Sequence, residues 1–133
     1  MPLKTGSCLC GDVRFELRGT LDGVIACHCS QCRKQTGHHW ASTHTADADL
    51  HFVADSTLRW YRSSDRAQRG FCSRCGSSLF WKTDGSTVTS VCVGSIDGPT
   101  GLQVAGHIFV ADKGDYYSLG DATGRGEYLK DGY

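Results

Sequence analysis

The stretch Cys27-His28-Cys29-Ser30-Gln31-Cys32 brings three thiols into six residues, and no fourth cysteine lies nearby in the chain. In an extended Cys-x-Cys segment both sulfurs point to the same side, because side chains alternate with a period of two. A tight turn then brings in the third sulfur. Three thiolates around one metal leave a coordination position open, and such a site does chemistry, whereas a closed four-ligand site holds structure. The trio of Cys27, Cys29 and Cys32 is therefore the candidate catalytic metal site.

Four further cysteines form two pairs with metal-type spacing, Cys8/Cys10 and Cys72/Cys75. Together they supply one closed tetrahedral zinc site. This site would join two regions more than sixty residues apart, where a metal staple stabilises most. A different partition, in which the trio takes one thiol from a pair, is less favoured because it strands a sulfur at a metal-like spacing. Cys92 is interpreted as a small buried hydrophobe, although the sequence leaves it open as a fourth ligand of the trio.

Three thiolates bring three negative charges to a divalent ion and so reduce its Lewis acidity relative to a three-histidine site. This donor set favours exchange with a soft ligand, such as a substrate thiol, over making hydroxide from water. The trio therefore indicates an enzyme that acts on sulfur compounds or carbonyls. Hydrolysis of peptides or phosphates is disfavoured.

The composition excludes several classes of partner. The chain has 133 residues, with 14 basic and 14 acidic side chains and a net charge of zero. This balance argues against binding to nucleic acid by phosphate neutralisation and against a polybasic membrane anchor. No apolar signal segment is visible at residues 1–11, and no run approaches the roughly 20 apolar residues that cross a bilayer. We therefore expect a cytoplasmic protein, in which eight cysteines are better explained by metal than by disulfides.

The elements that must position these cysteines are predicted to be short strands. Residues 13–18 alternate strictly between apolar and charged side chains, which is typical of a half-buried strand. Similar runs predict strands at 24–26, 38–44, 50–53, 58–61, 78–82, 87–93 and 104–110, with a hairpin at Asp84-Gly85. A helical turn is predicted at 33–37, a loop or irregular edge at 62–70, and a loosely wrapped tail at 114–133. The sequence thus predicts a single all-β domain over residues 1–133.

At these residues the sequence resembles the glutathione-dependent formaldehyde-activating enzymes, a family that includes centromere-protein-V-like proteins. The similarity lies in four stretches that occur in the right order: residues 6–11, 26–34 with Gly37, 69–76 and 106–110. Seven cysteines in three spaced clusters make this a far more specific signal than a lone Cys-x-x-Cys. The ending from Tyr116 to Tyr133 matches no pattern of the family.

The resemblance implies an Mss4-like fold, in which small β-sheets form a tent around a structural zinc. It implies two zinc ions per chain, a structural one held by Cys8, Cys10, Cys72 and Cys75 and a catalytic one held by the trio. It also implies a carbon–sulfur lyase activity that adds glutathione to formaldehyde to give S-hydroxymethylglutathione. The expected partners are then a small thiol such as glutathione and an aldehyde, with no nucleic acid and no membrane.

Other residues are candidates for supporting roles. A general acid would protonate the oxyanion, and the candidates are His28, His38, His39 and His107. The sequence favours other roles for them: His28 would point outward between two ligands, only one of the adjacent His38 and His39 can face a pocket from a strand, and His107 would be a core histidine. Arg33, Lys34 and Arg69 are candidates for binding carboxylates of the thiol, and each is equally consistent with a solvated surface charge. The three tryptophans are interpreted as core residues. A non-catalytic zinc module that binds a protein partner remains the alternative function, although such a module needs only the four-cysteine site.

Overall fold

The computed structural model describes residues 3–119 and, for the backbone, 127–129. By its internal contacts the chain divides into two compact units, Met1–Asp22 with Thr43–Thr100 and Gly23–Ser42 with Gly101–Tyr133. The prediction of a single domain stays a prediction. Among the described residues, no helix has the length and apolar character needed to cross a membrane.

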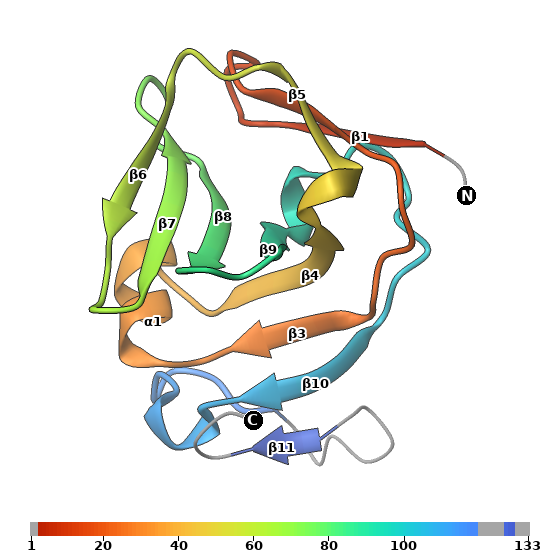
Figure 1. Ribbon diagram of the computed structural model, residues 1–133. Coiled ribbons are helices and arrows are strands. Elements are labelled where there is room, and N and C mark those ends of the chain that lie inside the picture. The colour runs from red at the N-terminus through yellow and green to blue at the C-terminus, as the bar shows by residue number, and fades with distance from the viewer. Residues whose placement is uncertain (1–2, 120–126, 130–133) are drawn as a thin grey trace. The chain divides into compact units, whose positions relative to one another are not determined.

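The first unit consists of antiparallel strands. One sheet has the order β1-β2-β5, with β1 at Lys4–Ser7, β2 at Arg14–Leu17 and β5 at Leu50–Ala54. A second run of neighbours follows the chain order from β6 to β9 (Figure 1), with bounds Leu58–Arg62, Ala67–Cys72, Ser78–Thr83 and Val88–Cys92. Two short 3-10 helices, Asp47–Asp49 and Val93–Ser95, also belong to this unit.

The core of the first unit is built from buried side chains of these strands. Phe15 and Leu17 alternate inward along β2. Leu79 and Phe80 are neighbours in β8, where the pairing with β7 shifts register, and Val91 lies in β9; all five side chains are at most 1% exposed. The Phe80 ring makes edge contacts with Phe15 and Phe52. Two cysteines of the predicted structural site, Cys8 and Cys72, are members of the same core cluster, so two of the predicted metal ligands take part in the hydrophobic packing.

The second unit is organised around β3 (Val24–Cys27), which leads directly into the trio. On one side β3 pairs antiparallel with the start of β4 (Trp40–Ala46), and on the other it pairs parallel with β10 (Val104–Ile108), as Figure 1 shows. The helix α1 (Ser30–Thr36) follows the trio's second cysteine and is capped at its C-terminus by Gly37. A short 3-10 helix at Val110–Asp112 follows β10. The strand β11 (Glu127–Leu129) pairs in parallel with β10.

The predicted all-β class is confirmed, since every element except one seven-residue helix and three 3-10 turns among the described residues is a strand. The bounds of the predicted strands lie within two residues of the observed ones, and the turn at Asp84-Gly85 joins β8 to β9. Residues 67–70 were predicted within a loop or irregular edge but belong to β7 (Ala67–Cys72), because Ala67, Arg69 and Gly70 are buried between β6 and β8. The short β1, with its single buried residue, was not predicted.

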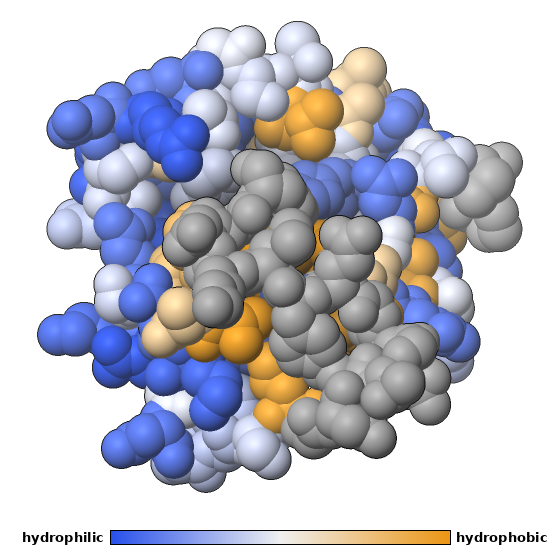
Figure 2. Space-filling model, turned by 90° about the horizontal axis from the view of Figure 1, so that it is seen from below, coloured by the Kyte–Doolittle hydropathy of each residue, from blue (hydrophilic) through white to orange (hydrophobic). Residues whose placement is uncertain are grey.

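The tail was predicted to be loosely wrapped from residue 114 onward. In the described parts, 114–119 and 127–129, this prediction is wrong, because Gly114 is buried, Tyr117 is hydrogen-bonded to His28 and Glu127–Leu129 forms β11. Residues 120–126 and 130–133 lie outside the described residues. On the face in Figure 2, hydrophilic residues surround a smaller group of hydrophobic ones.

We expect Phe80→Ala to lower the free energy of unfolding by about 3–5 kcal/mol, because it removes a buried ring and leaves a cavity between Phe15 and Trp60. The measurement is urea unfolding with excess zinc, so that metal loading is equal in all variants. Val88→Ala, at a position 40% exposed, is the control, with an expected change of about 0.5 kcal/mol or less. Equal losses in the two variants would contradict the assignment of the core.

Candidate metal centres

The four cysteines of the first group come together in the first unit. The sulfurs of Cys8, Cys10, Cys72 and Cys75 all lie within 4.8 Å of one another. The Sγ–Sγ distance is 3.6 Å between Cys8 and Cys10 and 3.8 Å between Cys10 and Cys72. Two thiolates bonded to one zinc at 2.3 Å in tetrahedral geometry stand about 3.8 Å apart. The spacing of the sulfurs therefore fits a single tetrahedral ion.

Two glycines form the turns that present these sulfurs. Gly11 follows Cys10 with a φ of 84° and Gly76 follows Cys75 with a φ of 80°, values that favour glycine. The second turn is closed by a 2.8 Å hydrogen bond from the Gly76 N–H to the Cys72 carbonyl. In the first segment the Val13 N–H donates to Cys8 Sγ at 3.3 Å. The Val13 N–H in the first segment and the Ser77 hydroxyl after the second turn thus lie against sulfurs of the group, as expected of metal-binding knuckles.

Neighbouring thiols and nearby hydrogen-bond donors shift the pKa values of the thiols in this group. The Ser77 hydroxyl, 3.2 Å from Cys75 Sγ, lowers the pKa of Cys75 to about 5. Burial raises the pKa of Cys72, but donors led by the Thr57 hydroxyl at 3.3 Å outweigh burial and bring it below its usual value. At Cys10 the backbone N–H of Asp12 lowers the pKa, yet burial and the neighbouring thiols raise it to about 12. Four sulfurs this close cannot all ionise without a cation between them.

The trio also comes together, in the second unit. Cys27 is the last residue of β3, Cys29 caps α1 in an extended conformation, and Cys32 lies in the first turn of the helix. Their three sulfurs lie within 4.8 Å of one another. The Cys32 N–H donates to Cys29 Sγ at 3.3 Å. Hydrogen bonds from the Cys27 and Cys32 thiols lower the pKa of Cys29, and hydrogen bonds to the Cys29 and Cys32 thiols raise the pKa of Cys27.

Cys92 is placed apart from the four-cysteine group, at the end of β9 in the first unit. It is half-buried, and burial raises the pKa of its thiol. This environment agrees with its interpretation as a small packed residue. Arg69, a candidate for binding carboxylates, is only 5% exposed in β7 and is therefore not a solvated surface charge.

The four candidate histidines gather in the second unit around a residue that the sequence did not single out, Tyr117. His28 is fully buried, and its Nδ1 lies 2.5 Å from the Tyr117 hydroxyl while its Nε2 lies 3.0 Å from Nδ1 of His107. The rings of His38 and His39 lie 4.4 Å and 6.3 Å from the Tyr117 ring. Burial, together with the other imidazoles, lowers the pKa of His28 to about 4. His28 is therefore neutral at pH 7, with a partner on each ring nitrogen.

The strand register separates this histidine cluster from the trio. Cys27 pairs with Trp40 across β3 and β4, so their side chains share one face, whereas His28 and His39 point to the opposite face. Trp40 is 6% exposed, which confirms its prediction as a core residue. Its Nε1, like Nε of Arg33 and Nδ1 of His39, is buried without a hydrogen-bond partner among the described residues. Unpaired buried N–H groups are costly, so these atoms are positions where a ligand oxygen would be stabilised.

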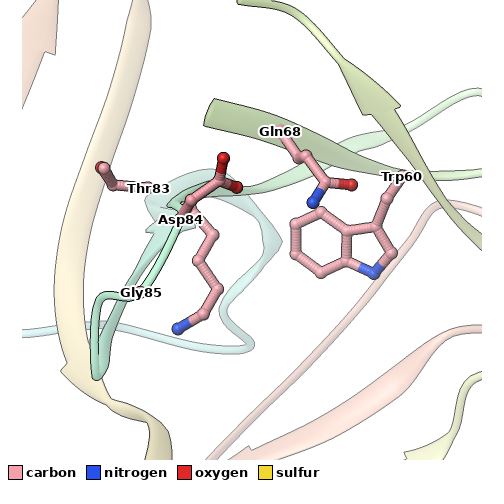
Figure 3. Close-up of a pocket in the computed structure, with 6 residues that line it drawn as sticks. Trp60, Gln68, Thr83, Asp84 and Gly85 are labelled. Atoms are coloured by element: carbon pink, nitrogen blue, oxygen red, sulfur yellow. The ribbon is translucent and has the colours of Figure 1, made fainter. Parts of the chain in front are cut away.

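A cavity of about 270 Å³ lies in the first unit and includes none of the predicted site residues. Figure 3 shows its lining, which consists of Trp60, Gln68, Lys82, Thr83, Asp84 and Gly85. Its charged groups are already engaged, because Asp84 pairs with Arg62 and Lys82 with Asp47. Trp60 is 39% exposed and stacks on Phe80, so it is less buried than the core prediction implied.

Comparison with known proteins agrees with the predicted fold. A crystal structure of a Rhodobacter sphaeroides protein superimposes with a TM-score of 0.61 at 21% identity, covering 94% of this chain and 99% of the other, and shares the fold. A Schizosaccharomyces pombe protein described as an uncharacterized lyase is 24% identical over 128 residues, which is 92% of this chain and 90% of the relative.

A Halomonas elongata protein that carries the name of a glutathione-dependent formaldehyde-activating enzyme is 37% identical over 86 residues. That alignment covers 59% of this chain and 55% of the relative. The family model described as glutathione-dependent formaldehyde-activating enzyme matches residues 3–112, which include both cysteine groups. The chain therefore belongs to the glutathione-dependent formaldehyde-activating enzyme family.

Proposed function

We propose that this protein is a zinc-dependent carbon–sulfur lyase that forms or cleaves a thiol–aldehyde adduct such as S-hydroxymethylglutathione. The observation that carries the proposal is the trio: three sulfurs within 4.8 Å of one another, grouped without a fourth protein ligand among the described residues. Family membership supports the same class of reaction, as do the names of the lyase from Schizosaccharomyces pombe and the formaldehyde-activating enzyme from Halomonas elongata.

The two cysteine groups have different roles in this proposal. Cys8, Cys10, Cys72 and Cys75 hold a structural zinc, for which the sulfur spacing of 3.6–3.8 Å is suitable. The trio holds the catalytic zinc, which supplies a Lewis-acidic position open to a thiolate or a carbonyl oxygen.

The reaction forms one carbon–sulfur bond. The thiol sulfur gives an electron pair to the aldehyde carbon, the carbonyl π pair moves to oxygen, and the thiol proton ends on that oxygen to give the hydroxymethyl adduct. The Trp40 N–H is on the Cys27 face and unpaired, so it is suited to donate to the developing oxyanion. Arg33 follows Cys32 directly and has an unpaired Nε, which is suited to a carboxylate of the thiol.

The activity test is the rate at which S-hydroxymethylglutathione forms from glutathione and formaldehyde above the uncatalysed rate, followed by NMR exchange spectroscopy. We expect catalysis by the zinc-loaded wild type and none by Cys29→Ser. Glutathione at millimolar concentration should also raise the melting temperature, because a ligand of the native state must stabilise it. A wild-type rate equal to the uncatalysed rate would reject this substrate pair.

The two metals should respond differently to substitution. We expect Cys29→Ser to bind one zinc per chain instead of two and to keep its fold, because the trio lies outside the core cluster. Cys72→Ser should lose folding cooperativity, because Cys72 belongs to both the core and the four-cysteine group. Zinc content by elemental analysis, together with circular dichroism, checks both outcomes. If Cys29→Ser unfolds, the trio is structural and the catalytic role fails.

Arg33→Ala should raise KM for glutathione by about tenfold or more with a smaller change in kcat, because a hydrogen bond between charged groups contributes about 1.5–3 kcal/mol. Lys34→Ala is the matched control. Lys34 is the adjacent cation in α1 but is exposed, and we expect its KM to change less than twofold. Equal effects of the two substitutions would indicate general electrostatic attraction rather than a specific contact with Arg33.

A further inference from the structure

His28 occupies an unusual position between two of the trio's cysteines. Cys27 and Cys29 point their sulfurs to one face, and the imidazole of His28 points to the other. His28 is fully buried there, and its backbone N–H donates to the Ile108 carbonyl at 3.0 Å. Any rotation of the backbone that moves this imidazole therefore moves the two flanking sulfurs as well.

The imidazole is held on both sides by segments distant in sequence. The Tyr117 hydroxyl lies 2.5 Å from Nδ1 and His107 Nδ1 lies 3.0 Å from Nε2. A neutral imidazole has one donor and one acceptor nitrogen, so both contacts can be hydrogen bonds at once in either tautomer. Tyr117 is itself fixed, because Lys113 Nζ donates to its carbonyl oxygen at 2.6 Å and lies 5.0 Å from the centre of its ring.

We propose that Tyr117 is a positioning residue for the trio: its hydroxyl, acting through His28, holds the segment between Cys27 and Cys29 so that the sulfurs stay grouped when metal and ligand exchange. The proposal rests on the metal-binding role given to the trio in the proposed function. Tyr117 does not touch the reacting atoms in this proposal. It fixes the conformation in which three sulfurs face one ion.

A buried polar atom that loses its hydrogen-bond partner costs free energy. Removing the Tyr117 hydroxyl leaves a fully buried ring nitrogen without its partner, which costs about 1–3 kcal/mol. A backbone rotation at His28 can relieve that cost by turning the imidazole toward other polar groups or solvent, and such a rotation carries Cys27 and Cys29 with it. Loss of the hydroxyl should therefore appear as weaker and differently shaped metal coordination at the trio.

The experiment measures metal affinity in the full chain loaded with two metals. We expect Tyr117→Phe to weaken binding at the trio by about tenfold in chelator competition, which corresponds to about 1.4 kcal/mol, while the four-cysteine site keeps its affinity and serves as an internal control. With cobalt at the trio, the sulfur-to-metal charge-transfer and d–d absorption bands should shift in Tyr117→Phe. Tyr116→Phe is the matched control, because Tyr116 is 60% exposed and its hydroxyl makes only a 3.4 Å contact with the Gly37 carbonyl.

A second pair of variants tests the other contact of the His28 ring, between its Nε2 and Nδ1 of His107. This pair replaces the first if Tyr117→Phe does not fold. His107→Leu removes the partner of Nε2 and should weaken the trio as Tyr117→Phe does. His107→Asn keeps a polar group near the position of Nδ1 and should restore the affinity to within about threefold of wild type. An affinity and a cobalt spectrum at the trio that are unchanged in both Tyr117→Phe and His107→Leu overturn the proposal.

These measurements distinguish a failure of the positioning role of Tyr117 from a failure of the proposed lyase function. A wild-type chain that binds two metals but does not act on glutathione and formaldehyde rejects the substrate and leaves the positioning role to be judged by the affinities. A wild-type chain that binds one metal only rejects the trio as a metal site and the positioning role with it.

Discussion

The repulsion among closely spaced thiolates is the constraint on which the first unit depends. Cys10 and Cys72 approach to 3.8 Å although 62 residues separate them in the chain. Donors such as the Ser77 hydroxyl favour ionisation of Cys75, while the crowding of thiols opposes it at Cys10. A divalent cation would resolve this conflict by pairing with every sulfur. Because Cys8 and Cys72 are also core residues, binding such a cation would be coupled to packing of the core.

The sequence predicted the parts of the structure that depend on local pattern. Alternation located most strands, and Cys-x-Cys and Cys-x-x-Cys spacing located both sulfur groups, since each group needs only two or three short segments. It failed at β7, where Arg69 is polar by type but is buried between neighbouring strands. Burial of that kind is decided by partners from elsewhere in the chain, and a single run of residues carries no signal for it.

The supporting residues were predicted less well for the same reason. The four histidines were candidates for proton transfer, but their faces follow from the pairing of β3 with β4 and β10, which the sequence does not reveal. Cys27 and Trp40 share a face through this pairing, and His28 takes the other. Trp40 had been interpreted only as core, and its unpaired N–H became visible once the register was known. A signal for Tyr117 was absent, because tyrosine in a glycine-rich tail is an ordinary surface residue.

The residues that surround His28 come partly from inside and partly from outside the region that matches the family. The family match ends at residue 112, so it includes the cysteines, His28 and His107 but not Tyr117. The strand β10 presents His107 to His28 through regular pairing, whereas the tail supplies the second partner after a left-handed turn at Phe109 and a 3-10 helix. A buried imidazole with one partner would still leave one nitrogen unpaired. The tail of this chain thus supplies, from outside the matched region, the second hydrogen-bond partner of an imidazole that lies between Cys27 and Cys29.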